Sequence, residues 1–182
     1  ERFWDASAAT ARLSAVLARR LGAPYDVRPE DAYTFALFRD CGIPILMMPF
    51  PEYRGVLAKA NDDLESNFTD IEDVMIGLNH ATVGAELAED WRLPADICTA
   101  IRHHHDRAAI DGTDNSVLVD RPRALIAIAQ LAEHVIQNQT GLAKTSEWKK
   151  IGPVCLTALN IGTDDLPELE ADIVTSRAMH SD

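Results

Sequence analysis

Histidine and aspartate residues near the middle of the chain are the side chains best suited to chemistry. His80 stands alone within a largely apolar stretch, and His103, His104 and His105 form an unbroken run one short helix later. An imidazole can bind a metal ion or exchange a proton near neutral pH. Asp40 ends another apolar segment, where an ionised, buried carboxylate needs a cation or several hydrogen-bond donors. The chemistry therefore depends on which elements carry these residues.

The apolar residues around His80 predict that its ring faces the protein interior. At a helical period of 3.6 residues, His80 shares one face with Ile76, Val83, Leu87 and Trp91. We expect a single long helix, beginning near Thr69, to carry this face.

The next helix follows a turn at Arg92-Leu93-Pro94, because proline is tolerated in a first helical turn. Ile97 and Ile101 define its buried face. At about 100° per residue, His104 and His105 lie on either side of that face, and His103 points away toward solvent. Two consecutive helices thus direct imidazoles at an interior that they share.

Helical patterns extend over most of the remaining chain, and they predict an all-α protein of about seven to nine helices. The expected ranges are 2–21, 29–40, 52–61, 123–139, 148–159 and 166–179. Residues 43–50 are an apolar run for which a helix is favoured over a strand. Residues 106–122 show no periodic pattern, and we expect a lid or a mobile loop there.

Length and charge limit the class of protein. The 182 residues, 47% of them hydrophobic, are enough for one sizeable core, so we expect a single domain over 1–182. The chain has 17 basic and 29 acidic residues, a net charge of −12. Nucleic acids and anionic membranes attract clustered Lys and Arg, so neither is an expected partner.

Cysteine usage and hydropathy favour the cytoplasm. Cys41, Cys98 and Cys155 are widely spaced and form no Cys-x-x-Cys pair, so neither a disulfide framework nor a zinc knuckle is indicated. No apolar run reaches the roughly 18 residues of a membrane span, and no signal peptide is visible. The chain begins at Glu1 inside a helical pattern, so we expect it to be part of a longer protein.

Four features in this order carry a family resemblance. They are Phe3-Trp4-x-x-Ser7, Leu37-Phe38-Arg39-Asp40-Cys41-Gly42-Ile43, Asn79-His80-Ala81-x-Val83-Gly84-Ala85-x-Leu87-x-x-x-Trp91-x-Leu93-Pro94, and Ile101-x-x-His104-His105. The chain, over roughly residues 2–160, closely resembles the HD-related output domain (HDOD), a bacterial signalling relative of the HD superfamily of metal-dependent phosphohydrolases. The third feature is the specific one, because it fixes several residue types on one helix-turn-helix unit. The resemblance implies an HD-domain-like helical bundle with a regulatory role, and a further helical portion ahead of the part present here.

The resemblance also implies a metal pocket, in which the candidate ligands are Asp40, His80, His104 and His105. Catalytic HD proteins use a His-Asp pair, further histidines and a closing Asp to hold divalent cations that activate water. Here Arg39 replaces the histidine of the pair, and Gln130 stands where the closing Asp belongs. Ala6 or Ser7 stands where a first-helix histidine belongs. We therefore expect a degenerate pocket without a cofactor, the alternative being one divalent transition metal (Fe, Mn, Zn or Ni).

Simpler roles stay open for the same residues. Arg39 and Asp40 could form an internal ion pair that fills a vestigial site, which is the favoured interpretation, and His80 could be a core histidine bonded to Asp40 and a backbone carbonyl. We predict a bacterial, cytoplasmic signal-transduction module that binds a protein partner or a small ligand such as a nucleotide. The alternatives are a metal-dependent phosphodiesterase with a reduced ligand set and a structural module that forms homodimers.

Overall fold

Helices make up all the regular structure in the described part of the chain. The computed structural model describes residues 2–113, 118–141 and 145–178. The α-helices are α1 (Arg2–Leu21), α2 (Pro29–Phe38), α3 (Gly42–Leu46), α4 (Tyr53–Asp62), α5 (Phe68–Ile76), α6 (His80–Asp90), α7 (Ala95–His103), α8 (Arg107–Asp111), α9 (Asp120–Thr140), α10 (Glu147–Ala158) and α11 (Leu166–Ala178), with 3₁₀ turns η1 (Ala23–Tyr25) and η2 (Thr163–Asp165). The predicted all-α class is confirmed. Since α3 and α8 are single turns of five residues, the longer helices lie within the predicted number.

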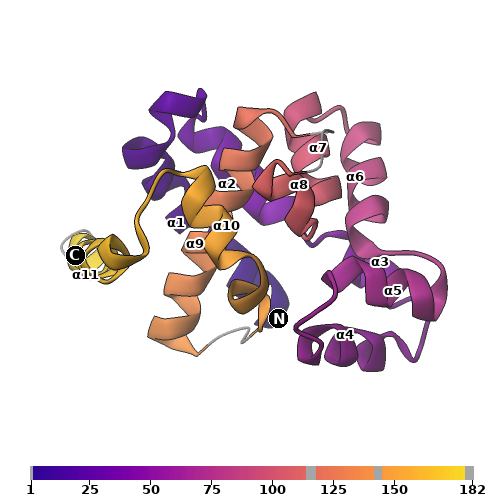
Figure 1. The fold of residues 1–182 in the computed structure, drawn as a ribbon. Coiled ribbons are helices and arrows are strands. Elements are labelled where there is room, and N and C mark those ends of the chain that lie inside the picture. Colours follow the sequence, from indigo (N-terminus) through magenta and orange to yellow (C-terminus); the bar gives the residue numbers. More distant parts are fainter. Residues whose placement is uncertain (1, 114–117, 142–144, 179–182) are drawn as a thin grey trace.

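Helix α9 is the centre of the main core. Every residue from Ala124 to Ala132 is buried, as the nearly all-round apolar pattern predicted. Helices α1, α2, α7 and α10 pack against it. In Figure 1, α3, α4 and α5 lie at the lower right of this core and α11 lies at the far left.

A second, smaller cluster of apolar residues holds α3 and α4 together. Leu46, Tyr53 and Val56 are its buried members, and Ile76 at the end of α5 packs against them. The helix favoured for the apolar run 43–50 is present as α3. The described chain therefore has two apolar clusters, a large one around α9 and a small one around α3 and α4.

The single long helix expected around His80 is wrong. Helix α5 ends at Ile76, Gly77 adopts a left-handed φ of 74°, and the Asn79 side chain accepts a hydrogen bond from the Thr82 amide to begin α6. His80 is fully buried, as predicted, but as the first residue of α6. Trp91, expected on the inward stripe, is 56% exposed and packs its ring edge on Phe38.

The segment 106–122 is more ordered than its sequence suggested. Asp106 caps α8 by accepting from the Ala109 amide, and Ile110 of this helix is fully buried. Helix α9 begins at Asp120. The expected lid or loop is therefore contradicted where the structure describes it, and residues 114–117 lie outside the described part. Among the described residues, no helix is long and apolar enough to span a membrane.

Close packing at Gly42 gives a test of the fold. A Cβ atom at Gly42 would lie 2.1 Å from the His80 carbonyl oxygen, whereas a Cβ at Gly55, on exposed α4, would meet nothing within 4 Å. We expect Gly42→Ala to lower the free energy of unfolding by about 3 kcal/mol, because backbone must shift. Gly55→Ala should raise it by about 0.5–1 kcal/mol, since alanine favours a helix. Urea titration of both variants measures this, and equal effects would contradict the packing of α3 against α6.

Candidate functional site

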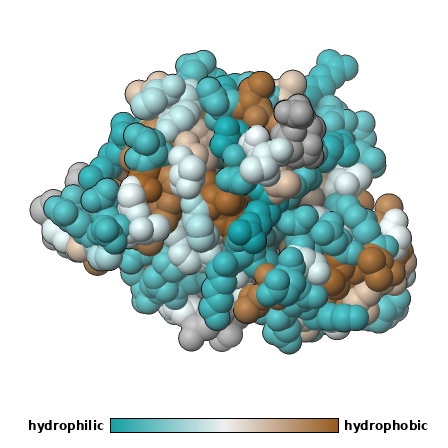
Figure 2. All heavy atoms as spheres, in the orientation of Figure 1, coloured by the Kyte–Doolittle hydropathy of each residue, from teal (hydrophilic) through white to brown (hydrophobic). Residues whose placement is uncertain are grey.

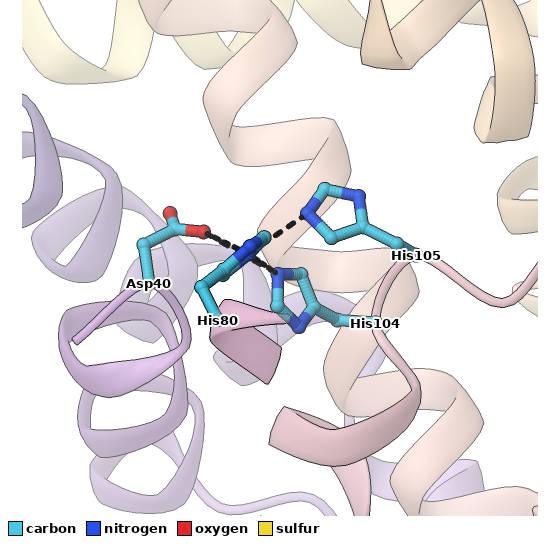
Figure 3. Close-up of side chains that lie close together, drawn as sticks. All are labelled: Asp40, His80, His104 and His105. Atoms are coloured by element: carbon cyan, nitrogen blue, oxygen red, sulfur yellow. Dashed lines mark hydrogen bonds and ion pairs between the residues drawn. The ribbon is translucent and has the colours of Figure 1, made fainter. Parts of the chain in front are cut away.

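Asp40, His80, His104 and His105 converge on one point. One ligand atom from each lies within 4.8 Å of the other three. His80 Nε2 is 3.4 Å from His104 Nε2 and 3.2 Å from His105 Nε2, and Asp40 Oδ1 is 3.6 Å from His80 Nε2 and 3.3 Å from His104 Nε2. Figure 3 shows the four side chains pointing toward one another. The structure thus brings together all four candidate ligands.

Element ends place these side chains. Asp40 lies in the turn after α2, His80 is the first residue of α6, and His104 and His105 follow the last turn of α7. The three segments approach closely because Gly42 and Gly84 leave no Cβ between α3 and α6. Tertiary packing of these segments therefore brings the histidines together in a compact cluster.

Each histidine ring is held by an acceptor on its far nitrogen. The Nδ1 atom of His80 donates to Glu72 Oε2 at 2.7 Å, that of His104 to the Ile101 carbonyl at 2.7 Å, and that of His105 to Glu147 Oε1 at 2.6 Å. Since these bonds place the proton on Nδ1, the Nε2 lone pairs face the centre. The same arrangement orients metal-bound histidines in proteins.

Further buried groups support the acceptors. The Tyr53 hydroxyl donates to Glu72 Oε1, so a chain of hydrogen bonds runs from α4 through α5 to His80. Phe68 stacks on the His105 ring with centroids 4.9 Å apart. The Lys150 ammonium lies 3.9 Å from Glu147 Oε2 and donates to the Ala60 carbonyl. The rings thus have little freedom to turn away from the centre.

Burial and neighbouring charges shift the pKa values of the cluster residues in different directions. Burial, and next the charge of His105, lower the pKa of His104 to about 4, and burial holds the pKa of His105 well below its usual value. Burial also opposes a charge on His80, but hydrogen bonds to Asp40 and Glu72 outweigh it and raise its pKa to about 9. Burial likewise opposes the Asp40 charge, yet Arg39 and the histidines hold its pKa well below the ordinary value. The cluster therefore accommodates one positive charge among its three rings.

Arg39 is a buried cation beside this cluster. Its guanidinium pairs with Asp40 Oδ2 through Nε at 3.1 Å and with Glu133 Oε1 through Nη2 at 2.7 Å, and Nη1 lies 3.5 Å from Gln130 Oε1. Gln130 in turn donates to Glu133 Oε2. The internal Arg39–Asp40 ion pair that the sequence favoured is therefore present. Gln130 lies in the pocket but bonds to Arg39 and Glu133.

A cavity of about 170 Å³ lies against the site. Arg39, Asp40, His80, His105 and Gln130 form its polar side, and the residues of its other walls include Ala6, Ser7, Thr10, Ile43, Phe68 and Ile136. Ala6 and Ser7 thus lie where the resemblance placed them, at the edge of the pocket. A small ligand could therefore reach the histidine cluster from the side of α1.

The residue set fits a single metal ion. A tetrahedron with bonds of about 2.0–2.1 Å has edges of roughly 3.3–3.4 Å. Four of the six ligand-to-ligand distances, at 3.2–3.6 Å, are close to this length, and all lie within 4.8 Å. A proton on His80 does not satisfy the cluster equally well, because its neighbours at 3.2, 3.4 and 3.6 Å lie at or beyond ordinary hydrogen-bond length. The residues that would hold the ion are Asp40, His80, His104 and His105.

Sequence reasoning missed three carboxylates of the site, Glu72, Glu133 and Glu147. Glu133 had a readable signal, because it lies one helical turn after Gln130 on the most apolar part of α9. Glu147 is 42 residues from His105, and Glu72, although eight residues from His80, reaches it across the break between α5 and α6. His103, expected to be exposed, is partly buried and has Nδ1 3.5 Å from Asp106 Oδ2.

Three solved structures share this fold. A candidate phosphohydrolase from Shewanella amazonensis SB2B matches 94% of this chain with a TM-score of 0.62 and 18% identity. An HDOD domain protein of unknown function from Geobacter sulfurreducens matches 96% with a TM-score of 0.60 and 23% identity. The response regulator MmoQ from Methylococcus capsulatus str. Bath matches 93% with a TM-score of 0.56 and 23% identity. At these identities the likeness shows the fold.

The chain spans only part of its relatives. It covers 59–60% of the three solved chains. An uncharacterized protein of Treponema pallidum (strain Nichols) is 28% identical over 76 residues, which are 42% of this chain and 15% of that protein. The HDOD domain model matches residues 1–107, more than half of the chain. This match, together with the shared helical fold, shows that the chain belongs to the HDOD domain family.

Proposed function

We propose that this chain is a regulatory binding module whose pocket holds one divalent transition metal ion and does not turn over phosphoesters. The observation that carries this is the convergence of Asp40, His80, His104 and His105, with each Nδ1 already bonded elsewhere. The cofactor-free pocket expected from Arg39 and Gln130 is not retained, because the ligand geometry favours an ion. When bound, such an ion supplies Lewis acidity and a link between the ends of α2, α6 and α7.

The ligand count favours a structural or sensing role over catalysis. Structural zinc sites are filled by four protein ligands, whereas catalytic sites keep a position open for water. Here Asp40, His80, His104 and His105 would hold the ion with four protein ligands, the number typical of a structural site.

Arg39 argues against a second metal ion. A two-metal hydrolase needs carboxylates that bridge or flank both ions. Asp40 Oδ2 and Glu133 Oε1 are instead bonded to the Arg39 guanidinium, a fixed cation that cannot act as a ligand. The buried Arg39 guanidinium supplies the positive charge that a second ion would bring.

A signalling role has support from the comparisons as well as from the site. MmoQ, which shares the fold, is a response regulator. The runner-up is a metal-dependent phosphohydrolase, which is favoured by the cavity beside the ligand set and by the candidate phosphohydrolase of Shewanella. Since the chain covers about 60% of these relatives, their whole-protein activities bear on it only as proposals.

Metal content tests the proposed site. Protein purified without chelators or a His-tag should carry about one transition metal ion per chain, by elemental analysis. Asp40→Ala and His80→Ala should abolish this binding. Glu72→Gln should weaken the affinity about 10- to 100-fold, because Glu72 orients the His80 ring. His103→Ala is the matched control, since His103 neighbours the cluster without belonging to it.

Two results would contradict this function in different ways. Absence of metal from the wild-type protein, even after incubation with Zn²⁺ or Mn²⁺, would show that the four side chains form only a polar core. Metal-dependent hydrolysis of bis-p-nitrophenyl phosphate that Asp40→Ala abolishes would establish the runner-up.

The buried cation gives a stability prediction. Arg39→Met removes the charge that compensates Asp40 and Glu133, so the metal-free protein should lose about 3–5 kcal/mol of unfolding free energy. Arg102→Met, which breaks the exposed Arg102–Glu89 pair, should cost at most about 1 kcal/mol. Urea unfolding in EDTA compares them, and equal losses would show that Arg39 does not hold the pocket together.

A further inference from the structure

A group of exposed apolar side chains lies on α5 and on the segments that follow α3, α4 and α5. Six of the twelve large hydrophobic residues exposed in the described chain fall between residues 47 and 78, namely Met47, Met48, Leu64, Val74, Met75 and Leu78. Val74 is 84% exposed and Met48 is 77% exposed, more than any other apolar side chain of this set. Figure 2 shows apolar surface at the lower right, where Figure 1 places α3, α4 and α5.

Packing beneath the surface brings these side chains together. Leu46 and Ile76 belong to the same small apolar cluster, one as a buried member and one packed against it. Met47 and Met48 directly follow Leu46, and Val74, Met75 and Leu78 lie within two residues of Ile76. Met47 and Met48 therefore lie in sequence next to one member of this cluster, and Met75 and Leu78 lie close to another. We call these six residues the α3–α5 face.

Strong negative charge accompanies this face. Between Met47 and Leu78 the chain has seven Asp or Glu residues and two basic residues, Arg54 and Lys59. Asp62, Glu65, Asp70 and Asp73 among them are exposed. Arg54 and Lys59 are also exposed, on α4, so acidic residues outnumber basic ones on this part of the surface. An acidic surface attracts a basic partner and repels an acidic one. A second copy of this chain, with a net charge of −12, is therefore a poor occupant.

We propose that the α3–α5 face binds a basic amphipathic helix of a partner protein. Methionine side chains are flexible and polarizable, and they suit a surface that accepts a helix with varied apolar residues. The apolar side of the helix covers Met48 and Val74, and its Lys or Arg residues lie near Asp70 and Glu65. This role rests on the proposed function only in that the module acts by binding, and it does not require the metal ion.

Synthetic helices serve as the probe. One fluorescent peptide of about 18 residues, five helical turns, combines Leu on one side with Lys on the other, and a second replaces every Lys by Glu. Fluorescence anisotropy should show saturable binding of the Lys peptide and at least about tenfold weaker binding of the Glu peptide. The double substitution Met48→Ser and Val74→Ser should weaken Lys-peptide binding by about fivefold or more.

Val174→Ser is the matched apolar control, since Val174 is exposed on α11, far from this face in Figure 1. The first charge variant combines Glu65→Gln with Asp70→Asn on the proposed face. The second, its control, combines Asp164→Asn with Glu168→Gln near the start of α11. The first charge variant should weaken binding, and the second should not. Circular dichroism confirms that all variants keep the helical fold, which is expected because every changed side chain is exposed.

Three results would overturn this assignment. They are no saturable binding, equal binding of the Lys and Glu peptides, and equal losses in the face variants and their controls. A dimer in light scattering that the double substitution dissolves would assign the face to a second copy instead. The metal content of the face variants separates the two proposals, because it should stay at the wild-type level even if the peptide fails to bind.

Discussion

Three buried imidazole Nε2 atoms that face one another at short distance are the constraint on which this structure depends. His104 and His105 resist protonation because they are buried, and their Nδ1 protons are already bonded to the Ile101 carbonyl and to Glu147. Lone pairs at 3.2–3.4 Å repel unless a positive charge lies among them. A proton on His80 supplies one charge but points at one neighbour, whereas a metal ion meets all the lone pairs together.

The residues around the histidine cluster connect helices that are distant in sequence. Asp40 brings the end of α2, Glu72 brings α5, and Glu147 brings α10 to the rings of α6 and α7. The close approach at Gly42 permits this, because any side chain there would meet the His80 carbonyl. Arg39 supplies a separate positive charge and keeps Asp40 and Glu133 from repelling each other. The pocket thus combines a candidate site for one metal ion with the permanent positive charge of Arg39. This combination suits binding better than hydrolysis.

Sequence reasoning identified the site residues better than the elements that carry them. The apolar neighbours of His80 predicted its burial, and the four ligand candidates converge as a set. The break before α6 was missed because the apolar periodicity continues across residues 77–79. In the structure, α5 ends before Gly77 and Asn79 caps the start of a new helix. Helix α8 was missed because five residues are too few for a periodic pattern. Glu72 and Glu147 could not be predicted, since their role arises from contacts between residues far apart in sequence or across a helix break.

The most direct test of a closed, four-ligand metal site is the visible absorption spectrum of the protein loaded with Co²⁺. Cobalt reports its coordination number, because four-coordinate Co²⁺ absorbs far more strongly than six-coordinate Co²⁺. A stoichiometric complex with the intense bands of four-coordinate Co²⁺, absent from Asp40→Ala, is the result expected for Asp40 and three histidines as the complete ligand set. A weak spectrum typical of six-coordinate Co²⁺ would mean that water occupies open positions, and it would contradict a closed binding site.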